Sequence, residues 1–321
     1  MDTSWEYPVC NFCHSKKNKT IWTDIITCEH KEKFRLVRCL KCGLIYLNPR
    51  PKVNEIKRYY QIESYWGLNL ADKKSKKINR KLRERNFGNI YHHILDFHKS
   101  GSILDIGCGT GEFLSKFQEI GWETLGIDIS KHSAEFAQRN YGVKVVVGNL
   151  LNINLNNKRF DVITLNSSLE HLYEPNETLS KIRKLLRKDG LLVIILPNFN
   201  SLGRLIFAKH WLGLHPPKHL YQFTLKTLSK MLRKNRFQII NKSHWYFRHN
   251  YYSLFESFRY RFSPRFFAKT KEEYKQLQTI SEFDLVKELG KIFAVIFAFT
   301  FSFIGSSIGM GETLTIYAKK T

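Results

Sequence analysis

Between residues 101 and 245 the hydrophobic pattern switches repeatedly between runs typical of buried strands and spacings typical of helices. The first apolar run, Ile103–Ile106, predicts a strand that leads into a glycine-rich turn and then a helix. Gly121 ends that helix, and Glu123–Ile127 predicts a second strand. The apolar face expected for the helix consists of Phe113, Leu114, Phe117 and Ile120. This order of elements predicts the opening of a nucleotide-binding βαβ unit.

The alternation continues beyond this unit and predicts an α/β fold of the doubly wound type. Further helices are expected at Ser133–Asn140, Glu177–Leu186 and Leu225–Asn235. Further strands are expected at Val143–Val147, Phe160–Leu165, Leu191–Leu196, Phe237–Trp245 and Thr313–Ala318. A turn at Asp189 and Gly190 is expected to separate the second helix from the strand that follows it.

Two features of the glycine-rich turn bear on which nucleotide it binds. A dinucleotide site has the spacing G-x-G-x-x-G, and here Glu112 occupies the place of the third glycine. Asp105 places a carboxylate beside the turn, where it would repel a pyrophosphate and attract an ammonium or sulfonium group. With Gly107, Gly109 and the acid Asp128, the stretch resembles motif I of the class I S-adenosylmethionine-dependent methyltransferases. A glycine-rich turn of an NAD enzyme is the alternative interpretation.

The resemblance covers residues 101–245 and the last ten residues, and it implies a fold, a cofactor and a reaction. The fold is a Rossmann-like sheet of seven strands in the order 3-2-1-4-5-7-6, with strand seven antiparallel. The enzyme would be a methyltransferase (EC 2.1.1.-) that uses S-adenosylmethionine. Asp128 would bind the ribose hydroxyls, and the amide oxygen of Asn149 would accept a hydrogen bond from the adenine amino group. The expected cofactor-binding residues are Asp105, Gly107, Cys108, Gly109, Gly111, Asp128, Ile129, Asn149, Leu150 and Asn166.

Two C-x₂-C pairs near the start of the chain predict a metal site rather than disulfides. Two residues between thiolates allow both sulfurs to face one ion, and two such pairs complete a tetrahedral site of four sulfurs. The predicted ligands of a structural zinc ion are Cys10, Cys13, Cys39 and Cys42. His14, Cys28 and His30 are nearby alternative ligands, and a ribbon that no longer holds metal is the competing interpretation. This use of cysteine favours a reducing, cytoplasmic compartment.

Two stretches carry candidate catalytic residues. Glu170 and His171 follow the predicted fourth strand, where ligands bind in open α/β sheets. They are similar to the E-x-x-E-H segment of the ubiquinone-biosynthesis O-methyltransferases, whose three acidic and histidine residues are associated with a metal, but Ser167 replaces the first glutamate here. The pair is therefore a general base, a partial metal site or a structural brace. His219 lies in a proline-rich loop, W-x-G-x-x-P-P-x-H, that recurs in zinc-ribbon-bearing bacterial methyltransferases, and it is either catalytic or structural.

The formal net charge of +24 and a hydrophobic insertion bear on possible partners. The charge fits nucleic acid, an anionic membrane surface or a phosphorylated substrate, or it merely solvates the surface. Part of it belongs to a basic run between residues 73 and 85, on a helix whose apolar stripe is Ile78, Leu82, Ile90, Ile94 and Phe97. Residues 292–310 carry no charge. We expect this stretch either to form a lid over the active site or to lie on a membrane surface.

Five segments are expected: a zinc-ribbon-like segment (1–50), a basic helical cap (51–98) that includes an aromatic-rich helix at Val53–Trp66, the methyltransferase domain (99–246), the insertion (247–311) and the final strand (312–321). The predicted reaction is methyl transfer to a small-molecule, glycan or lipid-linked acceptor, at oxygen in the first instance and otherwise at nitrogen or carbon. An RNA methyltransferase that uses the ribbon and the basic surface is the alternative. The expected location is the cytoplasm, with attachment to the inner face of the membrane as the variant.

Overall fold

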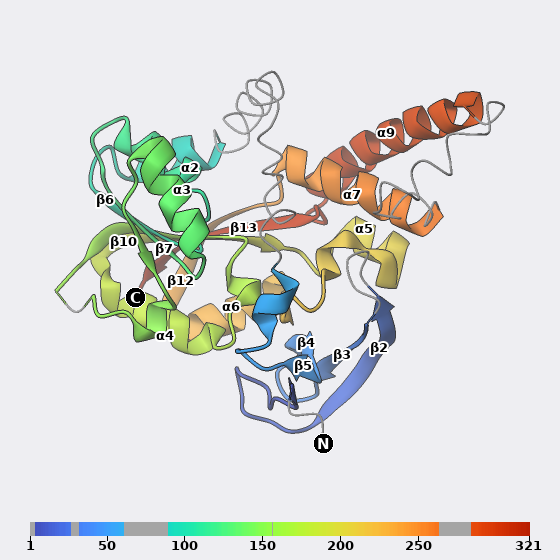
Figure 1. Cartoon of the computed structure of the whole chain (residues 1–321), viewed down its shortest axis with the longest axis horizontal. Coiled ribbons are helices and arrows are strands. Elements are labelled where there is room, and N and C mark those ends of the chain that lie inside the picture. The colour runs from blue at the N-terminus through green and yellow to red at the C-terminus, as the bar shows by residue number, and fades with distance from the viewer. Residues whose placement is uncertain (1–3, 27–31, 61–88, 156, 263–283) are drawn as a thin grey trace.

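A computed structural model of the chain describes residues 4–26, 32–60, 89–155, 157–262 and 284–321 (Figure 1). Its centre is a sheet of seven strands in the order β12-β13-β10-β9-β6-β7-β8. Only β13 runs antiparallel to its neighbours in this sheet, β10 and β12. The strands are β6 (Ser102–Ile106), β7 (Glu123–Asp128), β8 (Val145–Val147), β9 (Phe160–Asn166), β10 (Leu186–Pro197), β12 (Phe237–Ser243) and β13 (Thr313–Lys320). The predicted order 3-2-1-4-5-7-6 is confirmed.

Helices cover both faces of this sheet because alternate strand residues point to opposite sides. One core contains Ile90 and Ile94 of the helical residues 89–97, together with Phe113 and Phe117 of α2 (Glu112–Gln118) and Ala137 of α3 (Lys131–Tyr141). The other face packs against α4 (Pro175–Leu185) and α6 (Leu225–Lys234), which lie on the opposite side of the sheet from α2 and α3 (Figure 1).

Two expectations about element ends were wrong. Ile120 was assigned to the apolar face of the first helix, but α2 ends at Gln118 and the Ile120 side chain is 46% exposed. The turn expected at Asp189 and Gly190 lies within the long strand β10, where the pairing with β9 shifts register between Leu186 and Leu191. A bulge of this kind absorbs the extra residues without ending the strand.

The N-terminal segment forms a smaller sheet that is joined to the rest of the molecule. It contains β2 (Asn18–Ile26), β3 (Lys33–Cys39) and β4 (Ile45–Leu47), and β4 pairs with β11 (Tyr221–Gln222). A separate two-stranded sheet pairs β1 (Trp5–Glu6) with β5 (Arg50–Pro51). In the region of the expected helix Val53–Trp66, the described part is a short 3-10 helix, η1 (Ile56–Tyr59). The basic run 73–85 lies outside the described residues.

In the described part of the insertion before the last strand, helices α7 (Phe247–Phe262) and α9 (Asp284–Ser307) pack side by side and project from the body beside α5 (Leu202–Phe207) (Figure 1). Both ends of the insertion lie at one edge of the sheet, because β12 ends there and the antiparallel β13 begins there. Among the described helices, none combines the length and the apolar character needed to span a bilayer.

Candidate functional site

The glycine-rich turn between β6 and α2 requires backbone conformations that glycine adopts without strain. Gly107, Gly109 and Gly111 have φ values of 75°, 52° and 74°. The amide of Gly107 donates to the carbonyl of Ile127 at 2.7 Å, which ties the turn to β7. A Cβ on Gly107 would lie 2.6 Å from Cβ of Ser168. The turn therefore lies against the segment that follows β9, where the candidate catalytic residues begin.

Asp105, the predicted partner of the cofactor's positive charge, is buried near the end of β6. Its side chain is 2% exposed, and its Oδ1 accepts a hydrogen bond from Oγ1 of Thr164 at 2.6 Å. Burial raises the pKa of Asp105 to about 7, opposed by the hydrogen bond from Thr164 and reinforced by the charge of Asp128. A cationic ligand beside Asp105 would favour the carboxylate form.

Asp128, at the end of β7, has both carboxylate oxygens held by backbone amides. Oδ2 accepts from the amide of Gly109 at 2.8 Å, and Oδ1 accepts from the amide of Ser130 at 2.8 Å. Burial raises the pKa of Asp128, and these backbone hydrogen bonds oppose that rise. Because each carboxylate oxygen can accept more than one hydrogen bond, the fixed carboxylate can also bind the hydroxyls of a ribose.

The other predicted cofactor residues surround the same edge of the sheet with different exposure. Cys108 and Leu150 are buried, and Asn166 is half-buried at the end of β9. Ile129 is 63% exposed and can cover a bound nucleotide. The exposed Asn149 already accepts a hydrogen bond from the amide of Leu151 at 3.0 Å, so only its second lone pair is available to an adenine amino group.

Asp128 provides a graded test of the cofactor site. Asp128→Ala is expected to weaken binding of S-adenosylhomocysteine by about 10- to 100-fold, because hydrogen bonds to a charged group contribute about 1.5–3 kcal/mol. Asp128→Asn should lose less, since one acceptor oxygen remains for either Gly109 or Ser130. Isothermal titration calorimetry measures both affinities. Equal affinity of Asp128→Ala and the unchanged protein would contradict this assignment.

Glu170 and His171, in the short 3-10 helix η3 (Leu169–His171) after β9, meet His219 from the proline-rich loop. One potential ligand atom from each of the three side chains lies within 4.8 Å of the others. Glu170 is 1% exposed, and neither of its carboxylate oxygens has a hydrogen-bond partner among the described residues. Burial raises the pKa of Glu170 to about 8 and lowers the pKa of His171 to about 3. The three side chains have the composition and spacing to share a proton or to hold a divalent ion.

Backbone carbonyls orient both histidines. Nδ1 of His171 lies 2.9 Å from the carbonyl oxygen of Lys218, and Nδ1 of His219 lies 2.8 Å from that of Gly213. The amide of Leu220 donates to the carbonyl of Glu170 at 2.9 Å, which fastens the loop to η3. If each Nδ1 is the protonated nitrogen, Nε2 of each ring is the basic nitrogen.

Two residues of this region were not singled out from the sequence. The hydroxyl of Tyr60 lies 3.1 Å from Nδ1 of His171. Glu312 is 2% exposed and accepts hydrogen bonds from the indole of Trp211, the amide of Gly203 and the hydroxyl of Ser253, so it anchors the proline-rich loop. No sequence pattern distinguishes Tyr60 from the other aromatic residues around it. Glu312 could have been noticed, because it is the acidic residue that directly follows the uncharged stretch 292–311.

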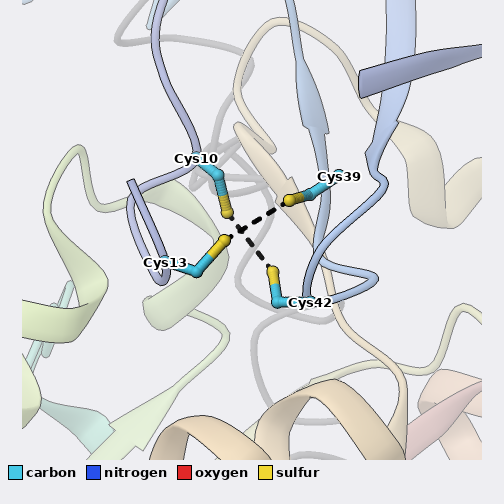
Figure 2. A group of neighbouring side chains, drawn as sticks. All are labelled: Cys10, Cys13, Cys39 and Cys42. Carbon is cyan, nitrogen blue, oxygen red and sulfur yellow. Dashed lines mark hydrogen bonds between the residues drawn. The ribbon is translucent and has the colours of Figure 1, made fainter. Parts of the chain in front are cut away.

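The four predicted zinc ligands come together at the base of the N-terminal sheet, with their sulfurs facing a common point (Figure 2). Sγ of Cys10 and Cys42 are 3.4 Å apart, and Sγ of Cys13 and Cys39 are 3.5 Å apart. A tetrahedral zinc–sulfur distance of about 2.3 Å places ligand sulfurs roughly 3.8 Å apart, so the four thiols have nearly the size of such a site. His14 is not part of the group, and Cys28 and His30 lie outside the described residues.

Fold and cofactor turn together define an α/β enzyme domain that binds a cationic nucleoside cofactor. Comparison with protein families agrees, because the family described as "Methyltransferase domain" matches residues 77–242. The chain belongs to this family, and it is a class I S-adenosylmethionine-dependent methyltransferase.

Among curated proteins, the chain is 29% identical over 110 residues to an uncharacterized protein of Methanocaldococcus jannaschii, covering 34% of this chain and 51% of that protein. It is 28% identical over 155 residues to a malonyl-[acyl-carrier protein] O-methyltransferase of Halalkalibacterium halodurans, covering 45% and 52%. A demethylmenaquinone methyltransferase of Staphylococcus saprophyticus is 29% identical over 105 residues, covering 30% and 45%. The chain thus spans about half the length of the curated relatives it matches.

Among solved structures, a SAM-dependent methyltransferase from Archaeoglobus fulgidus has a TM-score of 0.48 and 24% identity, covering 75% of this chain and 94% of that one. The plantazolicin methyltransferase BpumL, solved with a desmethyl substrate analogue and S-adenosylhomocysteine, has a TM-score of 0.46 and 16% identity, covering 81% and 93%.

Proposed function

We propose that this methyltransferase methylates a hydroxyl group of a small-molecule, glycan or lipid-linked acceptor, with His171 as the general base. The observation that supports this most is that Glu170 and His171, directly after β9, form a group with His219 of the proline-rich loop. Ser168, which begins this segment, lies against Gly107 of the cofactor turn. The names of two relatives, a malonyl-[acyl-carrier protein] O-methyltransferase and a demethylmenaquinone methyltransferase, also point to small or carrier-bound acceptors.

The chemistry follows from the position of His171. When bound, S-adenosylmethionine supplies a methyl group on a positively charged sulfur. Nε2 of His171 would accept the proton that the acceptor hydroxyl loses on methylation. The carbonyl of Lys218 holds the ring in place for this transfer. Positioning of the acceptor supplies most of the rate enhancement, so one base is sufficient.

Glu170 complements the charge that develops on His171. Burial raises the pKa of Glu170 to about 8, so its neutral form predominates while His171 is neutral at pH 7. In molecules whose Glu170 has lost its proton to solvent, the carboxylate would raise the pKa of His171 and stabilise the imidazolium that forms when His171 accepts the hydroxyl proton. Asp105 acts in the same way on the cofactor side, since a bound cation stabilises its ionised form.

His171→Gln tests the role of this histidine. The substitution is expected to lower kcat about 100-fold or more, because a general base contributes about 10²- to 10⁴-fold, and to leave the affinity for S-adenosylhomocysteine unchanged. Transfer of a labelled methyl group from S-adenosylmethionine into hydroxyl-bearing glycan, lipid and small-molecule pools measures the activity. His92→Gln, at an exposed histidine of the helical residues 89–97, is the matched control and should keep full activity. Full activity of His171→Gln, or label entering RNA alone, would contradict the proposal.

We further propose that Cys10, Cys13, Cys39 and Cys42 hold a structural zinc ion as thiolates. The two C-x₂-C pairs and the sulfur separations of 3.4 and 3.5 Å support this assignment. A site closed by four protein ligands leaves no position for a substrate, so the ion would stabilise the fold rather than take part in methyl transfer. The zinc ion would also stabilise the loop that carries His219, because strand β11, which directly follows that loop, pairs with β4 of the cysteine-bearing segment.

A further inference from the structure

Helix α9 has most of its large apolar side chains on the outside, and its fully buried positions hold small residues. Ala294, Ala298, Ser302 and Ser306 are buried, each at most 5% exposed, and Gly305 is buried as well. Large apolar side chains that are between 42% and 60% exposed form a surface that we call the α9 apolar face; they are Ile292, Phe293, Val295, Ile296, Phe299, Phe303, Ile304 and Ile308. A helix that only packs on a protein core has the reverse arrangement.

The inner side of α9 is already well packed against the protein. Phe297 stacks with Phe301 and meets Phe207 of α5 and Phe258 of α7, with ring centroids 4.3–6.0 Å apart. The amide nitrogen of Asn250 in α7 donates to the hydroxyl of Ser306 at 2.9 Å. The orientation of α9 is therefore fixed by contacts of its inner side, and the exposed apolar face is a consequence of that orientation. Contiguous exposed apolar surfaces of this size mark interaction sites.

Basic and amphipathic side chains lie around the α9 apolar face. Residues 292–310 carry no charge, whereas the exposed Lys209 and Arg261 lie near the α7 end that contacts Phe293. At the opposite end of α9, the ring of Trp245 contacts that of Phe303 at 5.3 Å, and the exposed Lys242 precedes it in the chain. Tryptophan and basic residues bordering an apolar helix face are the composition of helices that lie in the interface of anionic bilayers.

We infer that the α9 apolar face lies in the surface of an anionic lipid bilayer, with the helix parallel to the membrane plane. The exposed part, residues 292–308, is about 25 Å long at 1.5 Å per residue, which is short of the roughly 30 Å of a hydrocarbon core. Both ends of the insertion return to the same edge of the sheet, so the segment enters and leaves on one side of a membrane. The net charge of +24 complements an anionic leaflet.

This position identifies an acceptor class and, in that respect, rests on the proposed function. The insertion emerges at the edge where the parallel strands end, which is also the edge that carries the cofactor turn. Three strand spacings separate β13 from β6, which is about 14 Å. An active site at the edge of the sheet from which the insertion emerges is placed to take an acceptor whose lipid part stays in the bilayer and whose hydroxyl-bearing head group reaches His171.

Vesicle binding by the purified full chain tests the inference without relying on catalysis. The protein should co-sediment with vesicles of phosphatidylglycerol and phosphatidylcholine, bind less to phosphatidylcholine alone, and be released in part by high salt. Ile296→Asp/Phe303→Asp should lower partition at least about 100-fold, because burying each such side chain contributes about tenfold or more. Val53→Asp/Ile120→Asp, at two equally exposed apolar positions away from α9, is the matched control and should bind as the unchanged protein does.

The outcomes separate this inference from the proposed function. Unchanged affinity of all variants for S-adenosylhomocysteine shows that the methyltransferase domain is intact. Absence of binding to anionic vesicles, or equal binding of both double variants, would overturn the membrane assignment and leave the methyl-transfer proposal untouched. Sedimentation velocity provides a further arm: a dimer of the unchanged protein that becomes monomeric in Ile296→Asp/Phe303→Asp would show that the α9 apolar face binds a second copy of this chain, and would also overturn it.

Discussion

Cys10→Ser is expected to release zinc and to destabilise the N-terminal sheet by about 3 kcal/mol or more, because structural zinc sites supply about 10–16 kcal/mol of apparent binding free energy to the folded state. Cys10 is fully buried within the group, and its sulfur lies 3.4 Å from that of Cys42. Elemental analysis should give about one zinc ion per unchanged chain and much less for Cys10→Ser. Limited proteolysis should then cut preferentially within residues 4–47.

Two matched variants make this result specific. Cys28→Ser removes a thiol that lies outside the described residues and is one of the alternative ligands, and His14→Ala removes the alternative ligand that the structure describes. Both should keep the zinc ion and the stability of the unchanged protein. Loss of zinc in either would mean that the ligand set is different, and a stable, zinc-free unchanged protein would refute the site altogether. Affinity for S-adenosylhomocysteine should persist in Cys10→Ser, since the proposed cofactor site lies at the ends of β6 and β7, outside the cysteine group.

Gly107→Arg is expected to abolish measurable binding of S-adenosylhomocysteine, a loss of about 1,000-fold or more, because a side chain at this position would displace the segment after β9 as well as fill the cofactor turn. The backbone at Gly107 has a φ of +75°, and an added Cβ would meet Cβ of Ser168 at 2.6 Å. Strain in the left-handed region and the steric overlap therefore act together.

Gly121→Arg is the matched control for this substitution. Gly121 also has a positive φ, +83°, but a Cβ there meets no atom within 4 Å. Gly121→Arg should therefore show only the effect of backbone strain, a loss of about 1–2 kcal/mol in the free energy of unfolding, and its cofactor affinity should be unchanged. Calorimetry with S-adenosylhomocysteine and thermal unfolding distinguish the two effects. Comparable affinity in Gly107→Arg and Gly121→Arg would show that the turn does not hold the cofactor.

The sheet and the cofactor edge could be predicted from the sequence because both depend on local patterns. Buried parallel strands are short apolar runs, and their order is what the resemblance to the class I methyltransferases implies. The spacing from Gly107 to Asp128 likewise reflects local geometry, in which the acid at the end of β7 accepts from the amide of Gly109. Each C-x₂-C pair is also a short-range pattern, because two residues between the cysteines allow both sulfurs to face one point.

Other features depend on contacts between distant segments and could not be predicted. Tyr60 approaches His171 across 111 positions of the chain, and Glu312 reaches Trp211 across 101. The uncharged stretch 292–310 contains large apolar residues on every side, so its pattern does not indicate which side is buried. The packing of α9 against α7, with Phe297 between Phe207 and Phe258, determines that the side of α9 with Ala294 and Ala298 is buried.

The pairing of β4 with β11 has a consequence for how this enzyme can be divided. Residues 221 and 222 complete the sheet whose strand β3 ends at Cys39, and Arg50 of β5 donates to the hydroxyl of Tyr221 at 2.9 Å. Removal of the first 50 residues would remove Tyr46, the strand partner of Tyr221. Tyr221 is only two residues from His219, so the loss would reach the candidate site. A chimera that receives the cysteine-bearing segment of a related enzyme should therefore fold only when residues 211–224 of that enzyme are transferred with it. The two segments form one structural unit.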